Sequence, residues 1–143
     1  MGLDAIVYRK KENLPFDADA AGAEFNSITG EYYFADDAIE KRFPYEDRVA
    51  VSKRIGNINL VAALREEAQS VLDEDSVVLS KVLYSGTHAG DTLDSRVFAQ
   101  LERELSSLAQ QAEQTGSQRL KQFAADMKEL LAAARAENNP IVF

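Results

Sequence analysis

The only histidine of the chain, His88, lies in a glycine-flanked loop that reads Ser85-Gly86-Thr87-His88-Ala89-Gly90-Asp91. A glycine-rich loop between a strand and a helix can bind an anion through its backbone N–H groups and the helix dipole. This loop lacks both the Gly-Lys-Ser/Thr and the dinucleotide-binding patterns. We therefore expect a tight turn, with a ligand site formed by His88, Asp91 and Asp94 as the alternative.

A hydrolase would have to take its catalytic residues from this same loop. His88 would be the base, Asp91 or Asp94 would orient it, and Ser85 or Thr87 would be the nucleophile. Known triads take their members from distant parts of a chain, and these side chains all fall within ten residues. The chain has no cysteine and one histidine, which excludes a thiolate zinc site, a cysteine nucleophile and a multi-histidine metal site. We expect no enzyme activity and no cofactor.

Runs of adjacent acids offer a second kind of chemistry, because paired carboxylates can hold a magnesium or calcium ion. Such runs occur at Asp36-Asp37, Glu46-Asp47 and Asp73-Glu74-Asp75. None has the alternating ligands, central glycine and final glutamate of an EF-hand loop. We expect these runs to be solvated turns without a metal ion.

Negative charge gathers in the first third of the chain. Residues 12–47 contain ten acids and two bases, whereas the remainder has fourteen of each, so this segment carries the whole net charge of −8. Including the bases Arg9, Lys10, Lys11 and Arg48 halves the excess. A nucleic-acid partner is not expected, because phosphate contacts need clustered Lys and Arg and the sequence has no basic stripe.

The same segment holds seven of the twelve aromatic residues. Acids beside exposed aromatics suit a basic protein partner, since charge speeds encounter and aromatic side chains anchor the contact. We therefore expect a partner-binding surface made of Tyr32, Asp36, Asp37, Tyr45, Glu46 and Asp47. In the alternative, Phe16, Phe25 and Phe43 belong to the core and alternate residues of the strand over 32–34 face inward.

The elements that must position these residues follow from hydrophobic periodicity. Strands are expected at 3–8, 31–34 and 77–84, the last being apolar enough to be central, and the first two could pair antiparallel. Helices are expected at 37–43, 58–72, 94–114 and 117–137. Between the last two, Gly116 and Ser117 indicate a helix end and a new helix cap, so the pair should form an αα-hairpin. Residues 141–143 could be an edge strand or a loose tail.

This order predicts one α+β domain over residues 1–143, in the usual size range of a single domain. We expect a small antiparallel or mixed sheet of three to four strands, with helices on one face. The apolar stripes of the C-terminal helices are typical of core faces, with a dimer seam as the alternative. A structural or assembly protein that forms a homodimer through them is a further hypothesis.

No membrane contact is expected, because nothing in the sequence approaches the roughly 20 consecutive apolar residues of a membrane span. At the N-terminus the basic residues Arg9-Lys10-Lys11 follow the apolar run, whereas a secretory signal places them before it. These observations predict a cytoplasmic protein.

Two segments carry a resemblance. Met1-Gly2-Leu3-Asp4 leads straight into a strand, and Leu83-Tyr84 precedes the glycine-flanked histidine loop. Together they resemble small uncharacterised bacterial proteins of the toxin-immunity type. The resemblance implies a bacterial, cytoplasmic protein that binds and blocks a toxin. Many such toxins attack nucleic acids and would be basic, which agrees with the acidic segment. No site residue follows from the resemblance.

Overall fold

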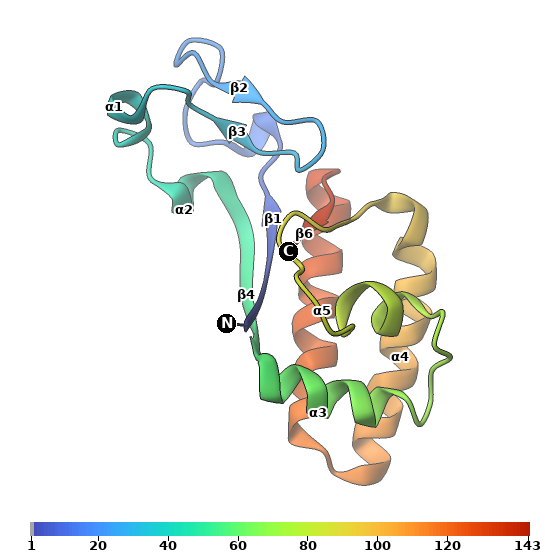
Figure 1. Cartoon of the computed structure of the whole chain (residues 1–143). Helices are drawn as coiled ribbons and strands as arrows, with labels where there is room; N and C mark the ends of the chain where they lie inside the picture. Colours follow the sequence, from blue (N-terminus) through green and yellow to red (C-terminus); the bar gives the residue numbers. More distant parts are fainter. Residues whose placement is uncertain (1) are drawn as a thin grey trace.

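A computed structural model describes residues 2–143 of the chain. Within them, a four-stranded sheet has the order β4-β1-β6-β5, and all neighbouring strands are antiparallel. Its strands are β1 (Gly2–Tyr8), β4 (Val49–Asn57), β5 (Thr92–Leu93) and β6 (Ile141–Val142). A separate ribbon pairs β2 (Glu24–Phe25) with β3 (Tyr32–Tyr33). Helices α3 (Ile58–Ala68) and α5 (Gln118–Glu137) pack against β1 and β4, and α4 (Phe98–Thr115) packs against α5 (Figure 1). The predicted α+β class is confirmed.

Strand β1 forms where alternate residues are apolar. Leu3, Ala5 and Val7 are buried, whereas Gly2 and Asp4 are exposed. This alternation is what a strand with one buried face requires. Strand β1 pairs with β4 along its length, and α5 packs against both strands. The predicted strand over 3–8 is thus confirmed, but its predicted pairing with residues 31–34 is wrong, because β3 pairs with nearby β2.

Strand β6 lies inside the sheet. Val142 pairs with Ile6 of β1, and Ile141 pairs with Leu93 of β5. The sequence predicted an edge strand or a loose tail for this segment, so its inner position is a correction. The partner strands lie far away in the chain, and a local pattern of two apolar residues does not reveal them.

The C-terminal helices α4 and α5 form the predicted hairpin. Gly116 has φ 71°, a left-handed conformation that glycine adopts without steric cost, and it ends α4. The Ser117 side chain then accepts a hydrogen bond from the backbone N–H of Leu120 and begins α5. The apolar stripes of both helices are buried in the core of this chain, as their interpretation as core faces predicted.

Residues 77–82 are helical and residues 83–84 form a bend, which corrects the prediction of a central strand over 77–84. They include a short π-helix, η2 (Val78–Val82). Buried Glu104 of α4 accepts hydrogen bonds from the backbone N–H groups of Val77 (3.0 Å) and Val78 (2.8 Å). A carboxylate at a helix start satisfies N–H groups that have no partner within the helix. Short apolar runs suit a buried strand or a buried helix equally, and Glu104 supplies the deciding contact.

Replacing Glu104 with alanine should lower the free energy of unfolding by about 2–3 kcal/mol, because two buried N–H groups lose a charged acceptor. Glu104→Gln keeps an acceptor oxygen and should cost less. Urea denaturation monitored by circular dichroism measures both. Glu102→Ala is the control, since the exposed Glu102 pairs only with exposed Arg135 on the same hairpin. An equal loss for Glu102→Ala would contradict the capping role.

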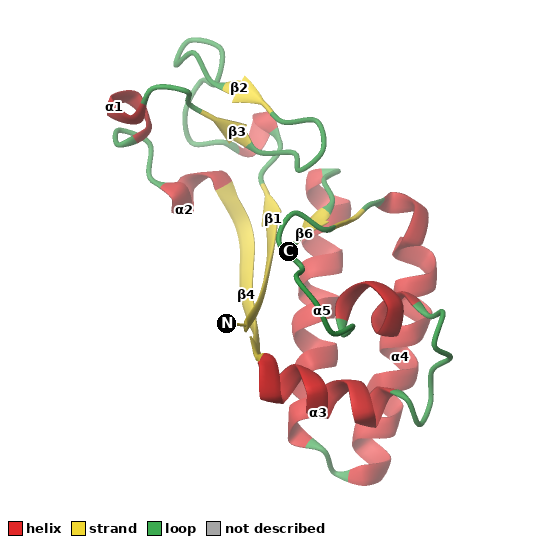
Figure 2. Ribbon diagram, in the orientation of Figure 1, coloured by secondary structure: helices red, strands yellow, loops and turns green. Residues whose placement is uncertain are grey.

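Residues 11–48 form a separate lobe past the ends of β1 and β4, which we call the acidic lobe (Figures 1 and 2). It contains η1 (Lys11–Asn13), β2, β3, α1 (Asp37–Glu40) and α2 (Tyr45–Arg48). Phe43 packs against Phe16 and Phe34, with ring centroids 4.5 and 4.9 Å away. These rings form a small core of the lobe, as the alternative reading of Phe16 and Phe43 proposed.

Candidate functional site

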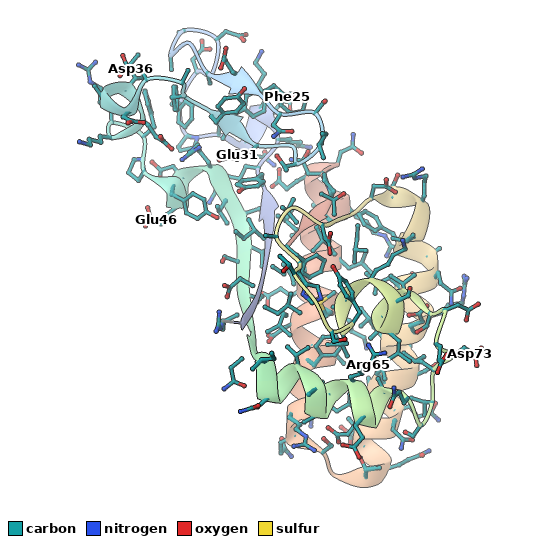
Figure 3. All side chains as sticks on the ribbon, viewed as in Figure 1. Phe25, Glu31, Asp36, Glu46, Arg65 and Asp73 are labelled. Atoms are coloured by element: carbon teal, nitrogen blue, oxygen red, sulfur yellow. The ribbon has the colours of Figure 1, made fainter. Side chains whose placement is uncertain are left out.

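The acidic lobe carries the four carboxylates predicted to meet a partner. Asp36 accepts a hydrogen bond from the backbone N–H of Ala38 (2.8 Å) and caps α1, and exposed Asp37 begins that helix. In α2, Glu46 is exposed and Asp47 is half-buried. Asp36 and Glu46 lie on the same outer edge of the lobe in Figure 3. Within residues 2–143, none of the four forms an ion pair.

The two predicted tyrosines differ in how they are presented. Tyr45 is 41% exposed, and its ring meets Tyr8 edge-on with 6.4 Å between centroids. Tyr32 is half-buried and packs against Phe25 at 4.9 Å. Phe25 itself is 52% exposed, which makes it a surface residue and corrects its alternative reading as core. Near it, Ile28 is 69% exposed, although no sequence pattern singled it out.

Buried Arg48, the last residue of α2, connects several parts of the lobe. Its guanidinium donates to Glu31 (3.0 Å), to Glu40 (3.1 Å) and to the backbone carbonyl of Tyr32 (3.1 Å), and Arg48 is only 2% exposed. It also lies over the Tyr45 ring, 5.7 Å from the centroid. Two of the ten acids of the segment are therefore neutralised internally, and Lys11 pairs with a third, Asp19.

Burial raises the pKa of the Glu31 carboxyl above its ordinary value of 4.5, although Arg48 acts in the opposite direction. The folded state therefore holds this proton more tightly than the unfolded state. Its stabilising contribution is complete below 4.5 and is lost as the pH rises through the folded-state pKa. Carboxyl-detected NMR titration should place the Glu31 midpoint above 4.5, and Arg48→Met should raise it further. A midpoint at or below 4.5 would contradict this account.

The structure gives the carboxylates of Asp91 and Asp94, two residues of the alternative ligand loop, partners other than His88. Asp91 accepts a hydrogen bond from the Tyr84 hydroxyl, a contact that raises the pKa of Tyr84. Asp94 caps η3 (Ser95–Val97) by accepting a hydrogen bond from the Arg96 backbone N–H (3.0 Å). It also binds the Arg96 guanidinium, and these bonds lower the pKa of the Asp94 carboxyl. Neither carboxylate forms a hydrogen bond or an ion pair with His88, whose ring packs against Tyr84 with 4.1 Å between centroids. The base–acid pair that a hydrolase needs is not formed.

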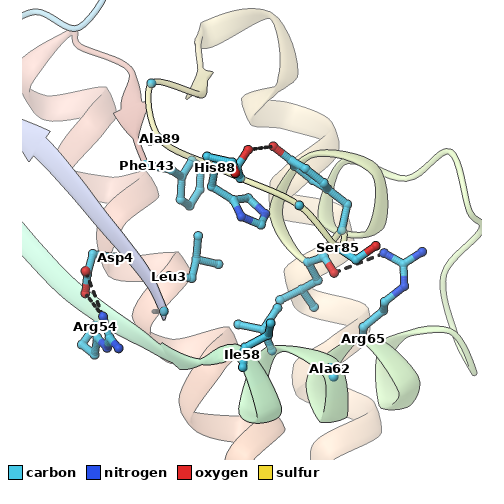
Figure 4. Close-up of a pocket in the computed structure, with 17 residues that line it drawn as sticks. Leu3, Asp4, Arg54, Ile58, Ala62, Arg65, Ser85, His88, Ala89 and Phe143 are labelled. Carbon is cyan, nitrogen blue, oxygen red and sulfur yellow. Dashed lines mark hydrogen bonds and ion pairs between the residues drawn. The ribbon is translucent and has the colours of Figure 1, made fainter.

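His88 lies instead in the wall of a cavity of about 640 Å³, which neither Asp91 nor Asp94 lines (Figure 4). Its walls come from the start of β1, the first turns of α3, the loop 83–90 and Phe143, and it is open to solvent on one side. Two arginines, Arg54 and Arg65, also line it. Sequence reasoning identified His88 but missed both arginines and Phe143, because they come from distant parts of the chain.

Within residues 2–143, no group of three or more His, Asp or Glu side chains is arranged to hold a metal ion. Among the same residues, no helix is both long and apolar enough to cross a membrane. Comparison of the chain with models of known protein families, with curated proteins and with solved structures gives no match.

Proposed function

We propose that this chain is a non-enzymatic protein-binding module that uses the outer surface of the acidic lobe to bind a basic protein. The supporting observation is the set of unpaired carboxylates on α1 and α2 beside the exposed ring of Tyr45. Unpaired surface charge of one sign steers an oppositely charged partner, and exposed aromatic side chains then supply contact area.

The distribution of charge within the lobe suggests that its four unpaired carboxylates bind a partner and do not stabilise the lobe. Glu31 and Glu40 bind Arg48, and none of Asp36, Asp37, Glu46 and Asp47 takes part in this internal network. On the same lobe, Phe25, Ile28 and Tyr33 leave apolar area exposed to solvent. Exposed apolar side chains and unpaired charge on one lobe are typical of an interface with a polar rim.

The partner class follows from this chemistry and from the resemblance of two short segments to toxin-immunity proteins. We propose a basic toxin as the partner, and the bacterial cytoplasm as the compartment in which the chain binds it. A chain without cysteine needs no oxidising environment to fold, which supports that compartment.

Affinity capture with two matched variants tests this function. The lobe variant carries Asp36→Asn, Asp37→Asn, Glu46→Gln and Asp47→Asn. The body variant carries Glu66→Gln, Asp73→Asn, Glu74→Gln and Asp75→Asn, which change the net charge equally at exposed positions outside the lobe. A basic protein from the source organism should be retained by the wild type and the body variant and lost by the lobe variant. Equal retention by all three would contradict the proposed surface.

A further inference from the structure

The cavity beside His88 has the size and lining of a small-molecule site. Its volume of about 640 Å³ lies within the range of ligand pockets, which are mostly apolar with a few polar groups. Leu3, Ile58 and Val61 supply apolar walls, and Phe143 lies opposite the first turns of α3 (Figure 4). The cavity lies among β1, α3 and the loop 83–90, away from the acidic lobe.

Arg65 is the polar anchor of this cavity. Its Nη1 donates to the backbone carbonyls of Leu83 (3.2 Å) and Leu79 (3.5 Å) at the end of η2. These contacts hold the guanidinium in place but leave its charge without a carboxylate, since Arg65 forms no ion pair with any residue in 2–143. A fixed guanidinium with free N–H donors binds a carboxylate in a geometrically specific way.

His88 forms part of the cavity wall. Its Nε2 atom is buried and has no hydrogen-bond partner among the described residues. Buried polar atoms are satisfied in most proteins, and a turn of the ring toward the cavity would let Nε2 bind a polar group of a ligand. Figure 4 shows the His88 ring on the cavity side of its loop, between Phe143 and the α3 wall that carries Ile58 and Arg65.

The other charged groups around the cavity favour a ligand with a single negative charge. Arg54 lines the cavity too, but Asp4 neutralises it at 3.0 Å. Asp4 and the net charge of −8 would repel a polyanion such as a nucleotide. Arg65 is therefore the uncompensated charge of a mainly apolar space.

We propose that this cavity binds a small organic monocarboxylate with an apolar body, with its carboxylate on Arg65 and His88 in the neighbouring wall. This inference is independent of the proposed protein-binding function, because it uses residues outside the acidic lobe. The proposed ligand site is defined by Arg65 and does not include the predicted Asp91 and Asp94.

Isothermal titration calorimetry with two matched probe pairs tests the site. Octanoate and indole-3-acetate carry the carboxylate, and octanamide and indole-3-acetamide have the same bodies without charge. At least one carboxylate should bind, and its amide should bind about tenfold more weakly, because the lost contact is a charge-assisted hydrogen bond. No binding of either carboxylate, or equal binding of each acid and its amide, would overturn the proposal.

Substitution of Arg65 tests whether this residue binds the carboxylate. Arg65→Met removes the charge but keeps a flexible apolar stem, and it should weaken carboxylate binding about tenfold without changing amide binding. Arg119→Met is the control, since Arg119 pairs with Glu67 and does not line the cavity. Unchanged carboxylate affinity in Arg65→Met would overturn the assignment.

A measurement on the wild-type protein covers the case in which Arg65→Met fails to fold. The side-chain NMR signals of Arg65 and His88 should shift with the carboxylate probe and stay in place with the amide. Shifts confined to other residues would reject the site. The lobe variant described above should bind the carboxylate normally, so loss of partner binding and loss of carboxylate binding are distinguishable.

Discussion

Reversing charge on the acidic lobe should slow association with a basic partner by about 10- to 1000-fold, the range over which electrostatic steering acts. The variant combines Asp37→Lys, Glu46→Lys and Asp47→Lys with Asp36→Asn. Asparagine at this position keeps the side-chain oxygen that caps α1, so the helix start is preserved. The dissociation rate should change less, because charges at the rim of an interface act mainly on encounter.

Stopped-flow association at several salt concentrations measures this effect. The wild-type rate constant should fall steeply as salt is added, whereas the reversed variant should show little or inverted dependence. The matched control carries Asp73→Lys, Glu74→Lys, Asp75→Lys and Glu66→Gln, which give the same net charge away from the lobe. A control as slow as the lobe variant would mean that total charge, and not this surface, governs association.

Replacing Arg48 with methionine should destabilise the protein by about 3–5 kcal/mol, the usual cost of removing one partner of a buried ion pair. Glu31 would then be left half-buried without its cation, and the carbonyl of Tyr32 would lose a donor. The loss should be smaller at acidic pH, where protonated Glu31 no longer needs a positive partner. Urea denaturation at neutral and acidic pH measures both effects.

Arg54→Met is the control for Arg48→Met. Arg54 pairs with Asp4, but more than half of each side chain is exposed. Exposed pairs contribute about 0–1 kcal/mol, so Arg54→Met should lie within that range. Equal destabilisation by the two substitutions would show that Arg48 acts as an ordinary surface residue.

Sequence patterns correctly predicted the elements that are stabilised by residues close to them in the chain. The alternation of β1 and the Gly116-Ser117 break between α4 and α5 are both readable within a few residues. The segment 77–84 could not be assigned in this way, because Glu104, which lies outside it, decides its conformation. Strand β6 likewise depends on β1 and β5, which lie far from it in sequence.

The same division holds for the candidate sites. The acidic surface was predictable because its residues are close together in the chain, and Asp36, Asp37, Glu46 and Asp47 do lie on one lobe. Pairing of Glu31 and Glu40 with Arg48 was not predictable, because long side chains meet only after folding. The cavity is the extreme case, since its wall combines the start of β1 with α3, the His88 loop and Phe143.

The inner position of β6 has a consequence for biosynthesis. Because Val142 pairs with Ile6, the sheet cannot close until the ribosome has synthesised residues 141–142. Until then β1 presents an open edge on the nascent chain, and open edges recruit strands from other molecules. The α4–α5 hairpin relies on local contacts, which favour rapid folding, so we expect β6 to insert after the hairpin has formed. A holding chaperone that shields β1 during translation would raise the yield of native protein.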